Sequence, residues 1–479
     1  MSFSKFRTTL TAGASVVVAL AVSTGLASAA ATTKTLSTNY TLVNLGTDTA
    51  TVTVNYYKED GTAWAAAAGS TNFTVAGNGG QAIIAQYFDA TMSSGRGSAV
   101  VASNQPMGAV VQILARNQTP TSGAYIGSSS TDDTFYIPLV QKSTGTNSQI
   151  MIQNAGTAAT TVTIDLIKAA ASPGANFQKL NQPIQAGATY YFDVTDEATI
   201  ASGWYGSAVI SSAGQLSVIS NKFAGADALQ TFNGFMSTQL GTSWFIPLFT
   251  SRLTNALSTP ISVQNLSGAT IAVGDLDMTC TKDQASGGSA TFPASNTAAV
   301  GINESYFFNP VIDTSLPTNW FGSCLVTAPG NVAVFVQMRK PGVSADEAAY
   351  EAINASGTHT TVLVPLVAKI LANGFATPVT IQNLDNSAAT VNITYTPSAA
   401  YISAGGSSTP LTESNVSIPA NGSLIRNFRL ASTFTTMPSG WYGTMTVTST
   451  GNALDGFVQL TTLGATSGDT LLAHGVFTK

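Results

Sequence analysis

Apolar and polar residues alternate with a period of two along many short stretches of this chain. In residues 50–58 the apolar positions are Val52, Val54 and Tyr56, and residues 160–168 show the same alternation. Such a period is typical of β-strands with one buried face, whereas an amphipathic helix would repeat about every 3.6 residues. Helical windows are nearly absent. The pattern therefore predicts an all-β protein.

Turn signals separate these stretches. The dipeptides Asn-Gly and Asp-Gly accept a positive φ, which tight hairpin turns require. They occur at Asp60-Gly61, Asn78-Gly79, Asn233-Gly234, Asn373-Gly374 and Asn421-Gly422. Short strands joined by such turns predict antiparallel sheets.

Three short phrases recur along the chain in the same order. The first is an apolar residue followed by Pro-Leu, and its prolines, Pro138, Pro247 and Pro365, lie 109 and 118 residues apart. The second is an apolar strand that ends in asparagine, and the third places an aromatic residue and a glycine just before an apolar strand. The asparagines are Asn44, Asn154, Asn265 and Asn383, and the aromatic phrases contain Trp204, Trp320 and Trp441, with Gly95-Arg96-Gly97-Ser98 as a degenerate first copy.

Three phrases in one order at one period predict four tandem units. After a leader of residues 1–29, we place repeat 1 at residues 30–134, repeat 2 at 135–243, repeat 3 at 244–361 and repeat 4 at 362–479. Units of about 110 residues built from short strands fit antiparallel β-sandwiches of immunoglobulin-like size. A β-barrel of the same length is the alternative.

The N-terminus has the pattern of a signal peptide. Lys5 and Arg7 precede an apolar run over residues 10–26, and Ala27-Ser28-Ala29 supplies small residues for cleavage. We expect removal of residues 1–29 and export of a mature chain that starts near Ala30, with an uncleaved anchor as the alternative. No later stretch has about 18 consecutive apolar residues, so we expect no membrane-spanning helix in the mature chain.

The two cysteines, Cys280 and Cys324, both belong to repeat 3. An even pair in an exported protein favours a disulfide, and closing a loop of this length stabilises a protein by roughly 4 kcal/mol in the entropic model. Two buried free thiols are the alternative.

Charge excludes one class of function. Charged residues make up only 9% of the chain, and 18 Lys+Arg against 23 Asp+Glu leave a net charge of −5 with no basic cluster. A protein that binds nucleic acid by neutralising phosphates needs a basic surface, so we expect no nucleic-acid partner.

Candidate chemistry is sparse. The two histidines, His359 and His474, have no recognisable nucleophile motif nearby, and no metal-binding or phosphate-binding motif occurs. The acidic clusters Asp132-Asp133 and Asp275 with Asp277 offer too few oxygens for calcium and fit solvated turns better. A glycosidase would need two carboxylates across a cleft, and nothing in the spacing points to such a pair. We therefore predict no catalytic residue, no metal and no cofactor.

The recurring side chains have structural interpretations. Asparagine after an apolar run can close a turn with its short amide, which we favour over a ligand role. The three recurring tryptophans fit an aromatic plug at one end of each core better than a sugar-stacking platform. Outside this pattern, Trp64 and Trp244 are the better candidates for exposed contacts, and Trp64 is the candidate glycan-binding residue. Trp244 precedes the Ile-Pro-Leu phrase, and packing between neighbouring units is its alternative role.

Repeat 1 lacks the apolar-Pro-Leu phrase, which we expect to be an edge strand because proline disrupts sheet interiors. The phrase precedes its asparagine by 16 residues in repeat 2, and the same count back from Asn44 reaches Ser28, inside the leader. After cleavage, either the tail from Ala30 to Leu36 folds back as a poorer strand, or the edge stays open for another molecule. A donor strand from the tail or from Leu471–Phe477 would join copies head to tail, and a heterologous contact of this kind builds filaments.

With these repeats and the leader, the mature chain resembles tandem immunoglobulin-like β-sandwich proteins of bacterial surfaces, such as S-layer, sheath, filament and stalk proteins. The resemblance is architectural and implies no functional residue. It favours a non-enzymatic, secreted structural protein whose partner is itself, and its low charge suits dense packing. The alternative is an adhesin or carbohydrate-binding array that contacts surface glycans through residues such as Trp64 or Tyr401, and a secreted hydrolase ranks third.

Overall fold

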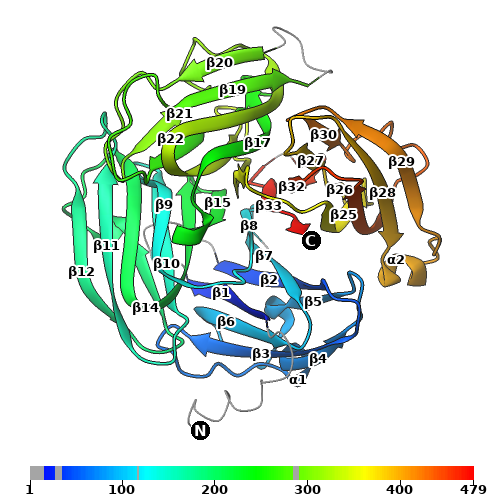
Figure 1. Cartoon of the computed structure of the whole chain (residues 1–479). Coiled ribbons are helices and arrows are strands. Elements are labelled where there is room, and N and C mark those ends of the chain that lie inside the picture. Colours follow the sequence, from blue (N-terminus) through cyan, green and yellow to red (C-terminus); the bar gives the residue numbers. More distant parts are fainter. Residues whose placement is uncertain (1–15, 27–34, 116–117, 284–290, 466) are drawn as a thin grey trace. The chain divides into compact units, whose positions relative to one another are not determined.

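The computed structural model describes residues 16–26, 35–115, 118–283, 291–465 and 467–479 (Figure 1). These residues form strands that pair antiparallel, and α-helix is limited to two single turns, α1 (Ala68–Thr71) and α2 (Ala399–Ser403). The predicted all-β class and antiparallel sandwich architecture are confirmed. Among the described residues, no helix is long and apolar enough to cross a membrane.

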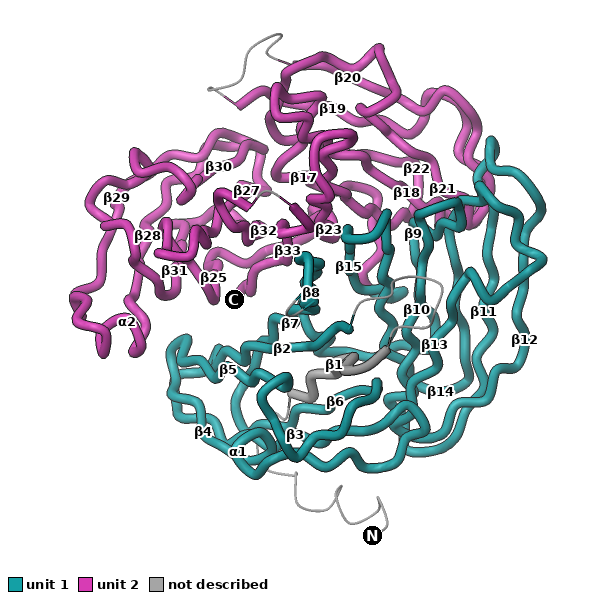
Figure 2. The backbone as a smooth tube through the Cα atoms, turned by 180° about the vertical axis from the view of Figure 1, so that it is seen from behind, with its two compact units in different colours: residues 1–238 teal, residues 239–479 magenta. Residues whose placement is uncertain are grey.

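The chain divides into two compact units, residues 1–238 and 239–479 (Figure 2). Unit 1 contains predicted repeat 1 and predicted repeat 2 up to residue 238, and unit 2 contains the last five residues of predicted repeat 2 together with repeats 3 and 4. The strands of the four repeats lie within residues 16–126, 132–236, 241–354 and 361–478, and from here the names repeats 1 to 4 denote these ranges.

Repeat 1 consists of two groups of four strands. The first group has the order β4-β3-β6-β1, and the second contains β5, β2, β7 and β8 in that order. Alternate residues of β3, among them Val52 and Val54, share one core with Tyr40 and Leu42 of β2. The bounds are β1 Val16–Leu26, β2 Thr35–Asn44, β3 Ala50–Lys58, β4 Asn72–Val75, β5 Gln81–Ala85, β6 Gly95–Ser103, β7 Met107–Ala115 and β8 Ser122–Ile126.

Repeat 2 has the same order, with one long strand serving both groups. The first half of β14 pairs with β11 and β9, and its second half pairs with β10 and β15. The bounds are β9 Asp132–Ser143, β10 Thr146–Asn154, β11 Thr160–Lys168, β12 Phe177–Ile184, β13 Thr189–Asp193, β14 Trp204–Ala224, β15 Ala228–Asn233 and β16 Phe235–Met236.

In unit 2, repeat 3 follows this plan with one long strand, and repeat 4 has the same order with two separate strands in its place. The strands of repeat 3 are β17 Gly241–Ser251, β18 Ile261–Asn265, β19 Asp277–Lys282, β20 Thr291–Ser295, β21 Ser305–Phe308, β22 Trp320–Arg339, β23 Glu347–Glu351 and β24 Ile353–Asn354. Those of repeat 4 are β25 Thr361–Lys369, β26 Phe375–Ala376, β27 Val379–Asn383, β28 Ala389–Pro397, β29 Leu411–Ile418, β30 Ser423–Arg426, β31 Trp441–Ser449, β32 Leu454–Thr462, β33 Leu472–Gly475 and β34 Phe477–Thr478.

The strands that carry Pro-Leu are not free edges, which corrects the sequence-based expectation. β9, β17 and β25 each pair on one side with the strand that begins at the recurring tryptophan and on the other side with a two-residue strand. Their pairing shifts register at the proline, for example between Ile246 and Phe249 of β17. A bulge tolerates proline because its residues make no regular ladder hydrogen bond.

In repeat 1, β1 takes the place of this first strand. It pairs with β6 from Val16 opposite Ser103 to Thr24 opposite Gly95, without a register shift. The structure therefore fills the position that the sequence leaves without a Pro-Leu phrase, and it does so with residues of the predicted leader. Ala30, the start of the alternative tail, lies outside the described residues, and Leu36 belongs to β2.

Candidate functional site

The asparagine that ends the second strand closes the following turn in every repeat. Asn265 is fully buried, its Nδ2 donates to the carbonyl oxygens of Ala269 (2.7 Å) and Val300 (2.9 Å), and its Oδ1 accepts the Ser267 N–H (3.1 Å). Asn44, Asn154 and Asn383 make the same contacts with the equivalent backbone groups. These side chains therefore form turns, as predicted, and their amides are occupied by the backbone.

The three recurring tryptophans lie inside the cores. Trp204, Trp320 and Trp441 are each at most 2% exposed. The Trp204 Nε1 donates to the carbonyl of Ala175 at 3.0 Å, which satisfies the indole within its own repeat. The predicted role as core plugs therefore fits the structure.

Trp64 is buried as well, which corrects the expectation of an exposed glycan contact. Its side chain is 4% exposed, and its Nε1 donates to the Ser93 Oγ at 3.0 Å. A Cβ added at Gly95 would lie 3.4 Å from the Trp64 ring. Gly95 stands where repeats 2 to 4 have their tryptophan, so Trp64 fills from another loop the space that repeat 1 leaves empty at this position. Trp244 is also buried.

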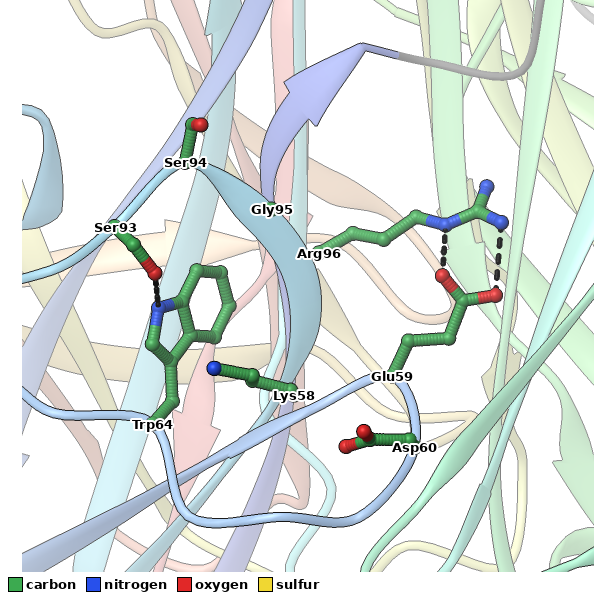
Figure 3. Close-up of a pocket in the computed structure, with 8 residues that line it drawn as sticks. All are labelled: Lys58, Glu59, Asp60, Trp64, Ser93, Ser94, Gly95 and Arg96. Atoms are coloured by element: carbon green, nitrogen blue, oxygen red, sulfur yellow. Dashed lines mark hydrogen bonds and ion pairs between the residues drawn. The ribbon is translucent and has the colours of Figure 1, made fainter.

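One pocket of about 410 Å³ opens beside Trp64 (Figure 3). Glu59 and Arg96 form a two-pronged ion pair on one side, with an Nη2–Oε1 distance of 2.8 Å. Asp60 is fully exposed, and hydrogen bonds from the Thr62 hydroxyl and N–H lower the pKa of its carboxyl. An acid catalyst needs the opposite shift. The remaining lining residues are Lys58, Ser93, Ser94 and Gly95.

Repeats 1 and 2 meet through apolar and polar contacts inside unit 1. Four side chains of repeat 2 belong to the same buried cluster as the core of repeat 1, and they are Met151, Ile219, Phe223 and Leu229. The Ser98 hydroxyl donates to the carbonyl of Gly187 (3.2 Å) and accepts from the Gln153 amide (2.9 Å). The Tyr191 hydroxyl donates to the carbonyl of Gly97 at 3.2 Å, and the Arg96 guanidinium lies 4.1 Å from the centre of the Tyr191 ring. These contacts join β6 of repeat 1 to β10, to β13 and to the turn before β13.

Repeats 3 and 4 meet in the same way inside unit 2. The Ser323 hydroxyl donates to the carbonyl of Asn421 at 3.2 Å, and the Ser423 hydroxyl donates to the carbonyl of Pro247 at 2.8 Å. Pro247 lies in the bulge of β17, so the bulge leaves its carbonyl available to the next repeat. Ser323 follows the glycine of the recurring third phrase, but the phrase gives no signal that this serine contacts the next repeat.

The cysteines lie directly opposite each other on β19 and β22. Cys280 pairs in register with Cys324, and their sulfurs form a disulfide. The bridge ties the two strands together at the centre of repeat 3.

The remaining candidate residues are separated in the structure. Asp132 accepts from the backbone and hydroxyl of Ser237, and Asp277 accepts from Ser295. His474 is buried, and burial lowers the pKa of its imidazole to about 4, so it is neutral at pH 7. Over the described ranges, no group of three or more His, Cys, Asp or Glu side chains is placed to hold a metal ion.

The C-terminal donor candidate is part of its own repeat. Leu471 is 4% exposed and Phe477 is 9% exposed. Phe477 pairs with Leu363 of β25, and β33 pairs with β32. Donation of this segment to another copy would therefore require its release from repeat 4.

Comparison with known proteins adds little to this description. No family model matches the chain, and neither does any curated protein. Among solved structures, the full-length pilus protein RrgB of Streptococcus pneumoniae aligns with 96% of this chain and 89% of its own, at 9% identity and a TM-score of 0.11. A TM-score this low carries no argument about this chain.

Proposed function

We propose that this chain is a non-enzymatic, secreted structural protein of the bacterial cell surface that assembles with its own copies into a filament, sheath or layer. The observation that carries the proposal is the position of β1. The segment predicted for removal is the first strand of repeat 1, so a processed chain would leave β6 without its partner along Gly95–Ser103.

Chain length favours completion by another molecule over the chain's own tail. Only residues 30–34 separate the predicted cleavage site from β2, and five extended residues reach about 17 Å. The ladder along β6 needs nine residues, about 30 Å. A donor strand that buries three apolar side chains at about 2 kcal/mol each would contribute roughly 6 kcal/mol before ordering is subtracted.

Surface chemistry supports dense packing of copies. With 9% charged residues and a net charge of −5, repulsion between neighbouring molecules is weak. Ser98 and Ser323 each join two repeats of one unit through a hydroxyl–carbonyl hydrogen bond, which supports packing of such modules on one another.

Electron microscopy and light scattering of residues 30–479 and of the full chain test the proposal. We expect stable polymers from the processed chain, whereas the full chain, whose position beside β6 is filled, should form none by strand completion. A peptide of residues 16–26 should block polymerisation when present in excess, whereas a scrambled peptide should not. A processed chain that stays monomeric at high concentration would contradict the proposal.

A glycan-binding adhesin is the second candidate, and the pocket beside Trp64 is the observation that favours it. Because Trp64 is buried, recognition would depend on polar groups such as Lys58 and Asp60. Loss of glycan-array binding in Lys58→Ala and Asp60→Ala, with polymerisation unchanged, would favour this function.

A further inference from the structure

Each unit shows a leading face of one repeat packed on a trailing face of the repeat before it. We define the leading face as the turn and strand of residues 186–191 in repeat 2 and 420–425 in repeat 4. The trailing face is the segment of residues 96–98 in repeat 1 and 321–323 in repeat 3. In both units a serine of the trailing face donates to a carbonyl of the leading turn, at 3.2 Å each.

Strand register identifies the leading face of repeat 1. The Asn44 N–H donates to the carbonyl of Gly80 as the Asn154 N–H donates to that of Ala188. Thr41 and Met151 each lie three residues before the asparagine of their repeat. Thr41 pairs with Ile83 of β5, and Met151 pairs with Tyr191 of β13. Gly79 therefore corresponds to Gly187, and Ile83 to Tyr191.

The trailing face of repeat 4 follows from a shared steric feature. A Cβ at Gly97 would overlap the carbonyl of Tyr57, and a Cβ at Gly443 would overlap that of Thr396. Gly97 lies opposite Lys58, the last residue of β3, and Gly443 lies opposite Pro397, the last residue of β28. The two glycines therefore occupy the same position in their sheets. Thr444 therefore corresponds to Ser98, and Tyr442 to Arg96.

These two faces are more exposed than their counterparts. Ser98 and Ser323 are at most 5% exposed under the following repeat, whereas Thr444 is half-buried. Ile83 is 71% exposed, although its counterpart Tyr191 packs on Arg96. Ile83 therefore presents an exposed apolar side chain at the position that its counterpart in repeat 2 uses to contact the preceding repeat.

We propose that the leading face of repeat 1 binds the trailing face of repeat 4 of a second copy. The Thr444 hydroxyl would then donate to the carbonyl of Gly79, and Ile83 would pack on the Tyr442 ring. The contact is heterologous, so it continues from copy to copy. This contact deepens the proposed function and rests on it, because it presupposes that copies of the chain assemble. The residues that form it are different from those of the strand position beside β6.

Cysteine crosslinking of the full chain tests the contact while β1 occupies its position. Copies with Ile83→Cys are mixed with copies with Tyr442→Cys under mild oxidation, and the native cysteines are already joined to each other. We expect a covalent dimer. The control replaces Ile83→Cys with Ile312→Cys, because Ile312 is 75% exposed in repeat 3, and it should yield at least tenfold less dimer.

The substitutions Ile83→Asp and Ile312→Asp provide a readout without oxidation. Both sites are exposed, so neither change disturbs a core. Self-association of the full chain at high concentration should weaken at least tenfold in Ile83→Asp and stay unchanged in Ile312→Asp, as measured by sedimentation.

Two results would overturn this inference. One is equal crosslinking by both cysteine pairs, or by neither. The other is a crosslink that forms only within single chains that carry both Ile83→Cys and Tyr442→Cys. If the processed chain still polymerises, the proposed function stands without this contact; if only the crosslink appears, the contact stands without strand completion.

Discussion

At the scale of single residues, a buried asparagine stabilises one turn within each repeat. Its side-chain amide donates to and accepts from main-chain groups that the turn would otherwise leave without a partner. A buried amide is stabilising only while its partners are present, since an unpaired buried polar group costs about 1–3 kcal/mol. This coupling explains why the same residue type ends the second strand in all four repeats.

Asn265→Ala should therefore destabilise unit 2 strongly. The change removes the side-chain partner of three carbonyls, one N–H and one hydroxyl, and we expect a loss of about 3 kcal/mol in the free energy of unfolding. Denaturant unfolding followed by tryptophan fluorescence would measure it. Asn452→Ala, whose side chain makes exposed hydrogen bonds, is the matched control and should cost under about 1 kcal/mol. Equal effects would contradict the assigned role.

Single residues also show where sequence reasoning failed. The sequence places Trp64 outside the repeating pattern, which suggested exposure, but the structure buries it against Gly95. Periodicity within one segment cannot show that a side chain from another loop fills the missing volume. The asparagine turns and the recurring tryptophans were predictable because their signals are local and occur in several repeats.

At the scale of elements, the recurring proline lies in a bulge of the first strand in repeats 2 to 4. The bulge at Pro247 interrupts the ladder of β17 and leaves a carbonyl for Ser423 of the next repeat. Alternation and turn residues predicted the strands themselves. They did not predict the bulge, because a register shift depends on the partner strand, nor the use of leader residues in β1.

Gly443 lies close to the backbone of the neighbouring strand, so a larger residue there should destabilise the sheet. Gly443→Ala would place a Cβ against the carbonyl of Thr396, a backbone atom that cannot move without breaking the β28–β31 ladder. We expect a loss of about 3 kcal/mol, typical of overpacking in a sheet. Gly451→Ala in the same repeat meets no atom within 4 Å and is the control. Thermal unfolding should separate the two variants, and similar midpoints would refute the steric argument.

At the scale of the whole molecule, the chain consists of two compact units, and each contains two repeats joined by equivalent contacts. Separate cores unfold as separate transitions unless their interface is large. Only unit 2 contains the disulfide.

The double variant Cys280→Ala with Cys324→Ala should therefore affect one transition only. Loss of a bridge that closes a 44-residue loop should destabilise unit 2 by about 2–4 kcal/mol and leave unit 1 unchanged. Calorimetry would resolve the two transitions, and reduction of the native protein should reproduce the effect. A shift of both transitions by the same amount would mean that the units unfold together.

The position of β1 has a consequence for biogenesis. If repeat 1 closes in the cytoplasm, the apolar residues of the predicted export signal lie in a ladder with β6, where translocation machinery cannot bind them. Export and folding then compete for the same residues. If the predicted leader directs export, the chain must reach the membrane before its first module folds, and slow folding of repeat 1 would favour delivery.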